Sequence, residues 1–144
     1  MFLYIQPVIK HHQITIEQHC NTQIELFGYP NEIGQVIINL INNAKDALLS
    51  NNVNQEKKIS ISLFKESNNT VITIQDNAGG IDPEIIEYVF DPYFSTKLKK
   101  NGTGLGLYIS KMVIEEHMNG KLSVTNGEEG AIFRVEFGEG FKIV

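Results

Sequence analysis

A lysine-bearing loop followed by alternating glycines is the first stretch whose residue types suit a chemical task. Gly102, Gly104 and Gly106 alternate with other residues where a helical pattern begins, and Lys97 is the first of three lysines in the preceding loop. Glycines at a helix start let the backbone approach a ligand, and the exposed N–H groups and positive helix end favour an anion such as phosphate. A tight turn without a ligand is the alternative interpretation.

Three polar residues recur at helical spacing inside a strongly amphipathic segment. Apolar residues at i, i+3, i+4 and i+7 predict a helix over residues 31–48, with Asn31 as its N-cap. Asn39, Asn43 and Asp46 share a narrow arc beside the apolar stripe of this helix. Because buried polar groups need partners, we predict a polar site there, with a solvated helix edge as the alternative.

An acidic residue ends a predicted strand on the side that faces the core. Side chains alternate along a strand, so Asp76 falls on the same face as Ile72 and Ile74. A buried carboxylate is costly unless something donates hydrogen bonds to it, and an exocyclic amine would serve. An Asx-turn at the strand end is the alternative, and the glycines that follow fit it as well.

These residues lie on a predicted alternation of strands and helices. Alternating apolar and polar residues predict strands near 14–16, 24–26, 59–64, 71–75, 121–125 and 132–137. Besides helix 31–48, we expect a short helix opening at Asp82 and a helix from Gly102 to about Met118. The buried face predicted for that last helix carries Leu105, Tyr108, Ile109, Met112 and Val113. The pattern predicts an α/β two-layer sandwich: a mixed, mostly antiparallel sheet covered on one face by helices.

Length and composition bound the class of protein. The chain has 144 residues, enough for one domain with a core, and a single cysteine, Cys20, which excludes an internal disulfide. Its net charge of −5 argues against a nucleic-acid surface. No run of about 18 apolar residues is present, so we expect no membrane contact by this domain and a cytoplasmic location, even if the parent protein is membrane-anchored.

Four segments, in order, now resemble one known family. They read QVIINLINNAKDAL, DNAGGI, DPYFSTK and GTGLGLYISKMVIEEHMNGKLSV. These look like the N, G1, F and G2 boxes of sensor histidine kinases, and the likeness covers residues 24–137. The resemblance implies the Bergerat ATP-binding fold of the GHKL superfamily, which also includes gyrase, Hsp90 and MutL.

The resemblance also implies a role for each matching residue. Asn43 would ligate Mg²⁺ at the ATP phosphates, with Asn39 and Asp46 beside the metal. Asp76 would accept a hydrogen bond from the adenine amino group, and Lys97 would reach the γ-phosphate. Gly80 would leave room for the base, and Gly102, Gly104 and Gly106 would present N–H groups to the phosphates. The resemblance assigns no role to Ala78.

The resemblance implies an ATP lid at about 88–103 within a single catalytic domain of residues 1–144, whose first 12 residues would be a remnant of a linker or helix. Two positions depart from the wider superfamily. Asn39 stands where gyrase, Hsp90 and MutL carry a glutamate base, which points away from hydrolysis, because a neutral amide cannot take a proton. Ala131 stands where many relatives have a hydroxyl that supports the adenine-binding acid.

No histidine of the chain has the sequence context of a phosphoacceptor, because none is followed by an acidic residue. The histidines are His11, His12, His19 and His117. We therefore expect the domain to bind ATP and Mg²⁺ and to phosphorylate a histidine on a separate dimerisation domain of the same parent protein, with a response regulator as indirect partner. An ATPase switch and a nucleotide-binding regulatory module are the alternatives.

Overall fold

The structure of the chain is a computed structural model that describes residues 13–20, 30–51, 55–94 and 104–138. Its elements follow in the order β1 (Thr15–Cys20), α2 (Pro30–Ser50), β2 (Lys58–Glu66), β3 (Asn69–Asp76), the 3-10 turn η1 (Ile86–Tyr88), α3 (Gly106–Met112), the π-helical turn η2 (Val113–His117), β4 (Lys121–Asn126) and β5 (Ala131–Phe137). The strand predicted near 24–26, Lys97 and most of the predicted lid lie outside the described residues.

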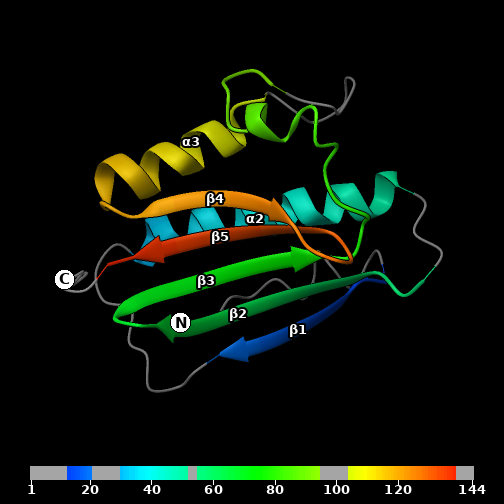
Figure 1. The fold of residues 1–144 in the computed structure, drawn as a ribbon, viewed down its shortest axis with the longest axis horizontal. Helices are drawn as coiled ribbons and strands as arrows, with labels where there is room; N and C mark the ends of the chain where they lie inside the picture. Colours follow the sequence, from blue (N-terminus) through cyan, green and yellow to red (C-terminus); the bar gives the residue numbers. More distant parts are fainter. Residues whose placement is uncertain (1–12, 21–29, 52–54, 95–103, 139–144) are drawn as a thin grey trace.

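The five strands form one mixed sheet in the order β1-β2-β3-β5-β4. β1 pairs with β2 in parallel, and the other three pairs are antiparallel. Figure 1 shows α2 crossing behind the sheet and α3 beside the edge strand β4, and α3 contacts both α2 and β4. The predicted α/β architecture, a mostly antiparallel sheet with helices packed on one face, is confirmed.

Helix α2 supplies the layer that covers the sheet. Its apolar stripe is buried as the helical period predicts, with Ile33, Val36, Ile37, Leu40, Ile41, Ala44 and Leu48 at most 3% exposed. The helix begins at Pro30, one residue before the predicted cap Asn31, and a proline suits the first helical position because it has no N–H to leave unpaired.

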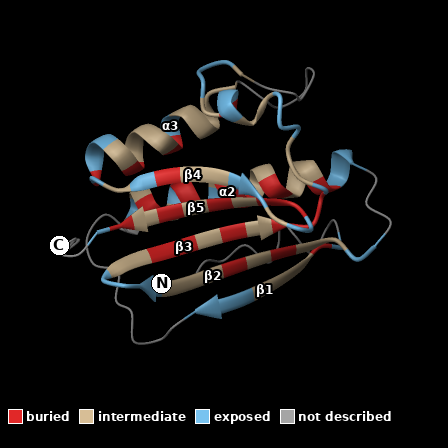
Figure 2. Cartoon of the chain, in the orientation of Figure 1, coloured by how far each residue is buried: buried red, intermediate tan, exposed pale blue. Residues whose placement is uncertain are grey.

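The central strands β3 and β5 carry the core of the sheet. Along β5 buried and half-buried residues alternate strictly, so Phe133, Val135 and Phe137 face the helices. In Figure 2 the buried residues concentrate on these inner strands, while much of β1 is exposed. β2 and β3 form a hairpin, and its two-residue turn places Ser67 at a positive φ of 56°.

Two helical predictions are corrected. The predicted buried face of α3 was wrong: Ile109 is 51% exposed, whereas Ser110, Ile114 and Met118 are buried. The helix changes to π-helical winding at Val113, which shifts the face that follows. Instead of a helix opening at Asp82, a turn leads to η1; the Asp82 carboxylate accepts the N–H of Glu84 at 2.9 Å.

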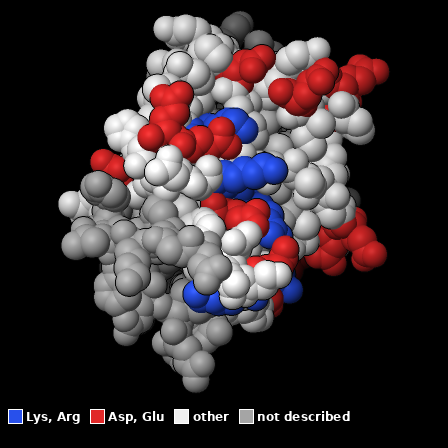
Figure 3. All heavy atoms as spheres, turned by 60° about the vertical axis from the view of Figure 1, so that its left-hand side comes forward, with Lys and Arg blue, Asp and Glu red and all other residues white. Residues whose placement is uncertain are grey.

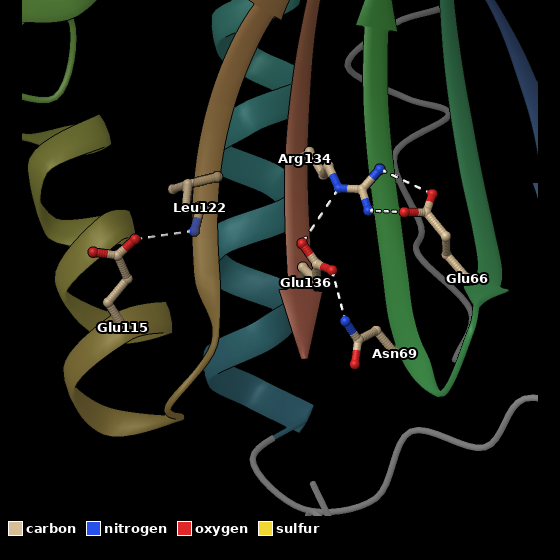
Figure 4. Close-up of polar contacts among 6 residues, drawn as sticks. All are labelled: Glu66, Asn69, Glu115, Leu122, Arg134 and Glu136. Carbon is tan, nitrogen blue, oxygen red and sulfur yellow. Dashed lines mark hydrogen bonds and ion pairs between the residues drawn. The ribbon is translucent and has the colours of Figure 1, made fainter. Parts of the chain in front are cut away.

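Charged side chains on the open face of the sheet are interleaved rather than gathered by sign. Arg134 of β5 donates to both oxygens of Glu66 at 2.9 and 3.3 Å and lies 3.5 Å from Glu136, which accepts from Asn69 (Figure 4). Hydrogen bonding by Asn69 and the nearby Arg134 lower the pKa of Glu136. Figure 3 shows lysines and arginines flanked by acids on the face turned forward.

Within the described ranges, no helix has the length and apolar content needed to cross a bilayer.

Candidate functional site

Asp76 is the acid around which the site is built. It ends β3 on the core side, as predicted, and is 5% exposed. One carboxylate oxygen, Oδ1, accepts the backbone N–H of Ala78 at 3.0 Å and of Ala131 at 3.3 Å. Burial nevertheless raises the pKa of Asp76, against the opposing effect of these two donors.

The two oxygens of Asp76 therefore have different surroundings. The bond from Ala78 is the Asx-turn that the sequence offered as an alternative, and it uses Oδ1 alone. Oδ2 receives no hydrogen bond from the described residues, so it is the oxygen free to accept one from a ligand. The Ala131 side chain has no hydroxyl to support this acid, and the backbone N–H of the same residue does so instead.

The strand turn between β4 and β5 closes over Asp76. An added Cβ at Gly130 would overlap both the backbone oxygen and Oδ1 of Asp76, so only glycine allows this approach. One residue earlier, the carbonyl of Glu129 accepts the N–H of Gly79 at 3.0 Å. The turn thus contacts the segment 76–81 at two successive points.

The opposite side of segment 76–81 is tied to the end of α2 and the start of β2. The Asn77 side chain donates to the Glu56 carbonyl at 2.7 Å and accepts the Lys58 N–H at 2.9 Å. Asn51, just after α2, donates to the carbonyl of Ala78 at 2.9 Å. The segment is held from both sides, and neither asparagine was predicted to be part of the site.

Gly80, which was expected to leave room for a base, has a positive φ of 92°. An added Cβ there would come within 2.8 Å of Oδ1 of Asn126 at the end of β4. The requirement for glycine therefore has two causes in this structure, the left-handed backbone and the neighbouring asparagine. By contrast, an added Cβ at Gly79 would meet no atom within 4 Å among the described residues.

Asn39 joins the helix α2 to the glycine segment that opens α3. Its amide nitrogen donates to the Ser110 hydroxyl at 2.8 Å, and Ser110 is 3% exposed. The Asn39 oxygen lies 2.8 Å from where a Cβ on Gly106 would be. The structure thus brings two predicted site residues, Asn39 and Gly106, together, and it adds Ser110, which the sequence did not single out.

Asn43 and Asp46 follow Asn39 along the same arc of α2. Asn43 is half-buried, and its amide has no hydrogen-bond partner in the part of the chain that the structure describes. The carboxylate of Asp46 is 31% exposed and lies 3.9 Å from the Lys45 ammonium. No group of three or more His, Cys, Asp or Glu side chains is placed to hold a metal among the described residues.

Tyr93, inside the lid predicted at about 88–103, meets Gly104, the residue just after that lid. The Tyr93 N–H donates to the Gly104 carbonyl at 2.8 Å. Both residues have positive φ, 65° at Tyr93 and 72° at Gly104, and a Cβ on Gly104 would lie 2.5 Å from the Tyr93 backbone. Glycine is therefore required at position 104, where the chain meets Tyr93; we call this contact between Tyr93 and Gly104 the lid base. Lys97 and Gly102 lie outside the described residues, so their predicted roles stay predictions.

Phe90 anchors the first part of the lid to the core. Its ring meets Phe133 edge to face at a centroid distance of 6.1 Å, and the Lys111 ammonium lies 4.6 Å from the Phe90 ring centroid. Lys111 also donates to the Leu122 carbonyl at 3.1 Å, and Glu115 accepts the Leu122 N–H at 3.2 Å (Figure 4). These contacts join the lid base, α3 with η2, and β4.

Comparison with known proteins supports this arrangement. Residues 28–140 match the family described as "Histidine kinase-, DNA gyrase B-, and HSP90-like ATPase". The two-component sensor PprA of Pseudomonas aeruginosa is 37% identical over 130 residues, which are 88% of this chain and 14% of that protein. Sporulation kinase C of Bacillus subtilis is 34% identical over 109 residues, 75% of this chain and 24% of that protein.

Solved structures give the same result. The catalytic domain of the histidine kinase ThkA in a nucleotide-free form has a TM-score of 0.79 and 29% identity, and the match covers 94% of this chain and 86% of that domain. ThkA in complex with the response regulator protein TrrA also matches, with a TM-score of 0.74, 26% identity and coverage of 94% of this chain and 37% of ThkA. The chain spans only 14% of the length of PprA and 24% of the length of sporulation kinase C. From its family match and its fold, the chain belongs to the histidine kinase-, DNA gyrase B- and HSP90-like ATPases, as an ATP-binding domain of the type found in sensor histidine kinases.

Proposed function

We propose that this domain passes the γ-phosphoryl group of Mg·ATP to a histidine on a separate phosphoacceptor and dimerisation domain of its parent protein. A response regulator would then be an indirect partner. The observation that carries the proposal is the way α2 spans the site: Asn51 at its end contacts the loop after Asp76, and Asn39 contacts the glycine segment at the start of α3.

The length of α2 sets the distance between these two contacts. Asn39 and Asn51 are 12 residues apart, or about 18 Å along the axis at the usual rise per residue. Asp76 lies at the Asn51 end and supplies an acceptor for the adenine amino group through its Oδ2. The glycines lie at the Asn39 end, where backbone N–H groups suit phosphates. Asn43 lies between the two ends.

Asn43 is suited to hold a magnesium ion together with the nucleotide. Its amide oxygen is a hard ligand, it is half-buried, and no described residue occupies its amide. Since no acidic cluster stands ready for a metal in the described ranges, the ion would arrive with ATP and keep phosphate and water ligands, as Mg²⁺ commonly does. Such an ion would neutralise charge that develops during phosphoryl transfer.

A histidine is a better acceptor for this site than water. Asn39 stands where a general base would be expected in an ATPase, and a neutral amide cannot accept a proton from water. The amide nitrogen is also committed to Ser110 at 2.8 Å. A neutral imidazole needs no base, because it already carries a nucleophilic lone pair.

Titration of ATP with and without Mg²⁺ tests the role of Asn43. We expect wild-type affinity to rise with Mg²⁺, and Asn43→Ala to lose that rise while binding ATP as the wild type does without the metal. Asn42→Ala is the matched control, because it removes the neighbouring amide from another side of the same helix and should keep the Mg²⁺ effect. An unchanged Mg²⁺ effect in Asn43→Ala would refute its role as a ligand.

Transfer is tested by incubating the domain with radioactive ATP, alone and with the histidine-bearing domain of its parent protein. We expect no label on the domain alone and acid-labile label on the added domain. Acid-stable label on the domain itself would indicate serine or threonine chemistry, and steady phosphate release without label would favour an ATPase switch. Binding of ATP with neither outcome would favour a regulatory module.

A further inference from the structure

Asn126, the last residue of β4, holds the end of the loop that follows Asp76. Its amide nitrogen donates to the Ile81 carbonyl at 2.7 Å, and its amide oxygen accepts the Ile81 N–H at 2.8 Å. A side-chain amide thus pairs with one residue through a donor and an acceptor, as a neighbouring strand would. We call this pair of hydrogen bonds the Asn126 clamp. The Ile81 side chain packs against the hydrophobic core, so the clamp holds the backbone of a residue whose side chain is also packed.

The same turn of the sheet fixes the other end of this loop. Ala131 donates to Asp76 Oδ1, and Glu129 accepts from Gly79. The turn is itself closed by the Gly127 N–H, which donates to the Gly130 carbonyl at 2.8 Å. The β4–β5 turn and the adjoining strand ends therefore contact segment 76–81 at the start, the middle and the end of that segment.

Gly80 shows how closely the clamp determines the backbone path. It lies directly before Ile81 with a φ of 92°, and its missing Cβ would point at Asn126 Oδ1, 2.8 Å away. The side of Gly80 that a side chain would occupy is thus covered by Asn126. A loop fixed in this way loses little freedom when a ligand binds beside it, whereas a loose loop would lose more and bind more weakly.

We propose that Asn126 is a positioning residue for the adenine end of the nucleotide: by pairing with Ile81 and covering Gly80, it presets the loop beside Asp76 and so raises the affinity for adenine nucleotides. This inference rests on the proposed function, because it takes adenine to bind at Asp76. It adds a residue to the site that acts through the loop and that the sequence marks only as the start of a turn.

The test is the affinity of the purified domain for ADP and AMP, measured by calorimetry without Mg²⁺ at a temperature where every variant is folded by circular dichroism. Asn126→Ala is expected to weaken both nucleotides by the same factor, roughly five- to tenfold, since it loosens the end they share. Asn69→Ala is the matched control, because it also removes an asparagine hydrogen bond, to Glu136 at 2.8 Å, but at the far end of β3. It should leave both affinities unchanged.

A second measurement uses Gly80→Ala in both backgrounds. In the wild type this change meets both the positive φ and the Asn126 amide; in Asn126→Ala only the backbone strain remains. The double variant should therefore lose less affinity than the product of the two single losses. Losses that multiply, or an Asn126→Ala variant that binds ADP like the wild type, would overturn the positioning role. A wild-type domain that binds no ADP would overturn the proposed function instead, and this inference with it.

Discussion

Replacing Asp76 by asparagine should separate its role in binding from its role in the fold. The new side chain has the same shape, and its oxygen can still accept the N–H groups of Ala78 and Ala131, which the structure places at 3.0 and 3.3 Å from Oδ1. The other position becomes an NH₂ group. It would face the amino group of adenine, so a donor would meet a donor where an acceptor is needed.

The expected loss of affinity follows from that exchange. A hydrogen bond to a charged group contributes about 1.5–3 kcal/mol, and a buried donor left without a partner costs about 1–3 kcal/mol. Taking roughly 3 kcal/mol in all, Asp76→Asn should weaken ADP binding on the order of 100-fold. Asp82→Asn is the matched control, because it removes the same charge from an exposed turn and should bind ADP like the wild type.

The same variant should not lose stability. Burial raises the pKa of Asp76, so the folded protein binds a proton at this residue more tightly than the unfolded chain does. The stability that protonation contributes is complete below the unfolded pKa and is lost as the pH rises through the raised folded pKa. Asp76→Asn should therefore melt at or above the wild-type temperature at neutral pH, with the gap closing in acid. A large loss of melting temperature with unchanged ADP affinity would refute the reasoning.

Two further predictions concern residues that shape the site. Gly130→Ala should abolish ADP binding and lower the melting temperature, because its Cβ would overlap Asp76; Gly138→Ala, whose Cβ would find its nearest neighbour at 3.8 Å, should do neither. Ser110→Ala should destabilise the domain by about 1 kcal/mol, or about 2–4 °C, through the unpaired Asn39 amide. Adding Asn39→Ala should cost little more, and additive losses would show that the bond at 2.8 Å is unimportant.

The sequence predicted the layers of this fold because its periodicities are strong. The stripe of α2 and the alternation along β5 each leave one arrangement that buries apolar side chains. The segment 105–114 is different, since apolar residues surround the helix and the period cannot select a face. In that segment the hydrogen bond between Asn39 and Ser110 turns a polar residue inward and leaves Ile109 exposed. This is a tertiary contact, so the local sequence pattern could not predict it.

The site was predictable to the extent that a single element determines it. Alternation along β3 was enough to place Asp76 on the buried face. Asn126 is 45 residues from Ile81 and pairs with it only because β4 ends beside the loop, so an Asn-Gly pair in the sequence indicates a turn and nothing more. The roles expected of Lys97 and Gly102 lie outside the described residues and stay predictions.

The described part of the site is held together by amides rather than by charges. Asn51, Asn77 and Asn126 bond to backbone groups, Asn39 bonds to a hydroxyl, and none of these side chains titrates. Asp76 is the only buried ionisable residue in the described ranges. Protonation of Asp76 would therefore change the acceptor proposed for adenine without loosening the neighbours that hold it. This combination explains how a costly buried carboxylate is tolerated: its neighbours are fixed and neutral, and its open oxygen is kept for a ligand that can donate to it.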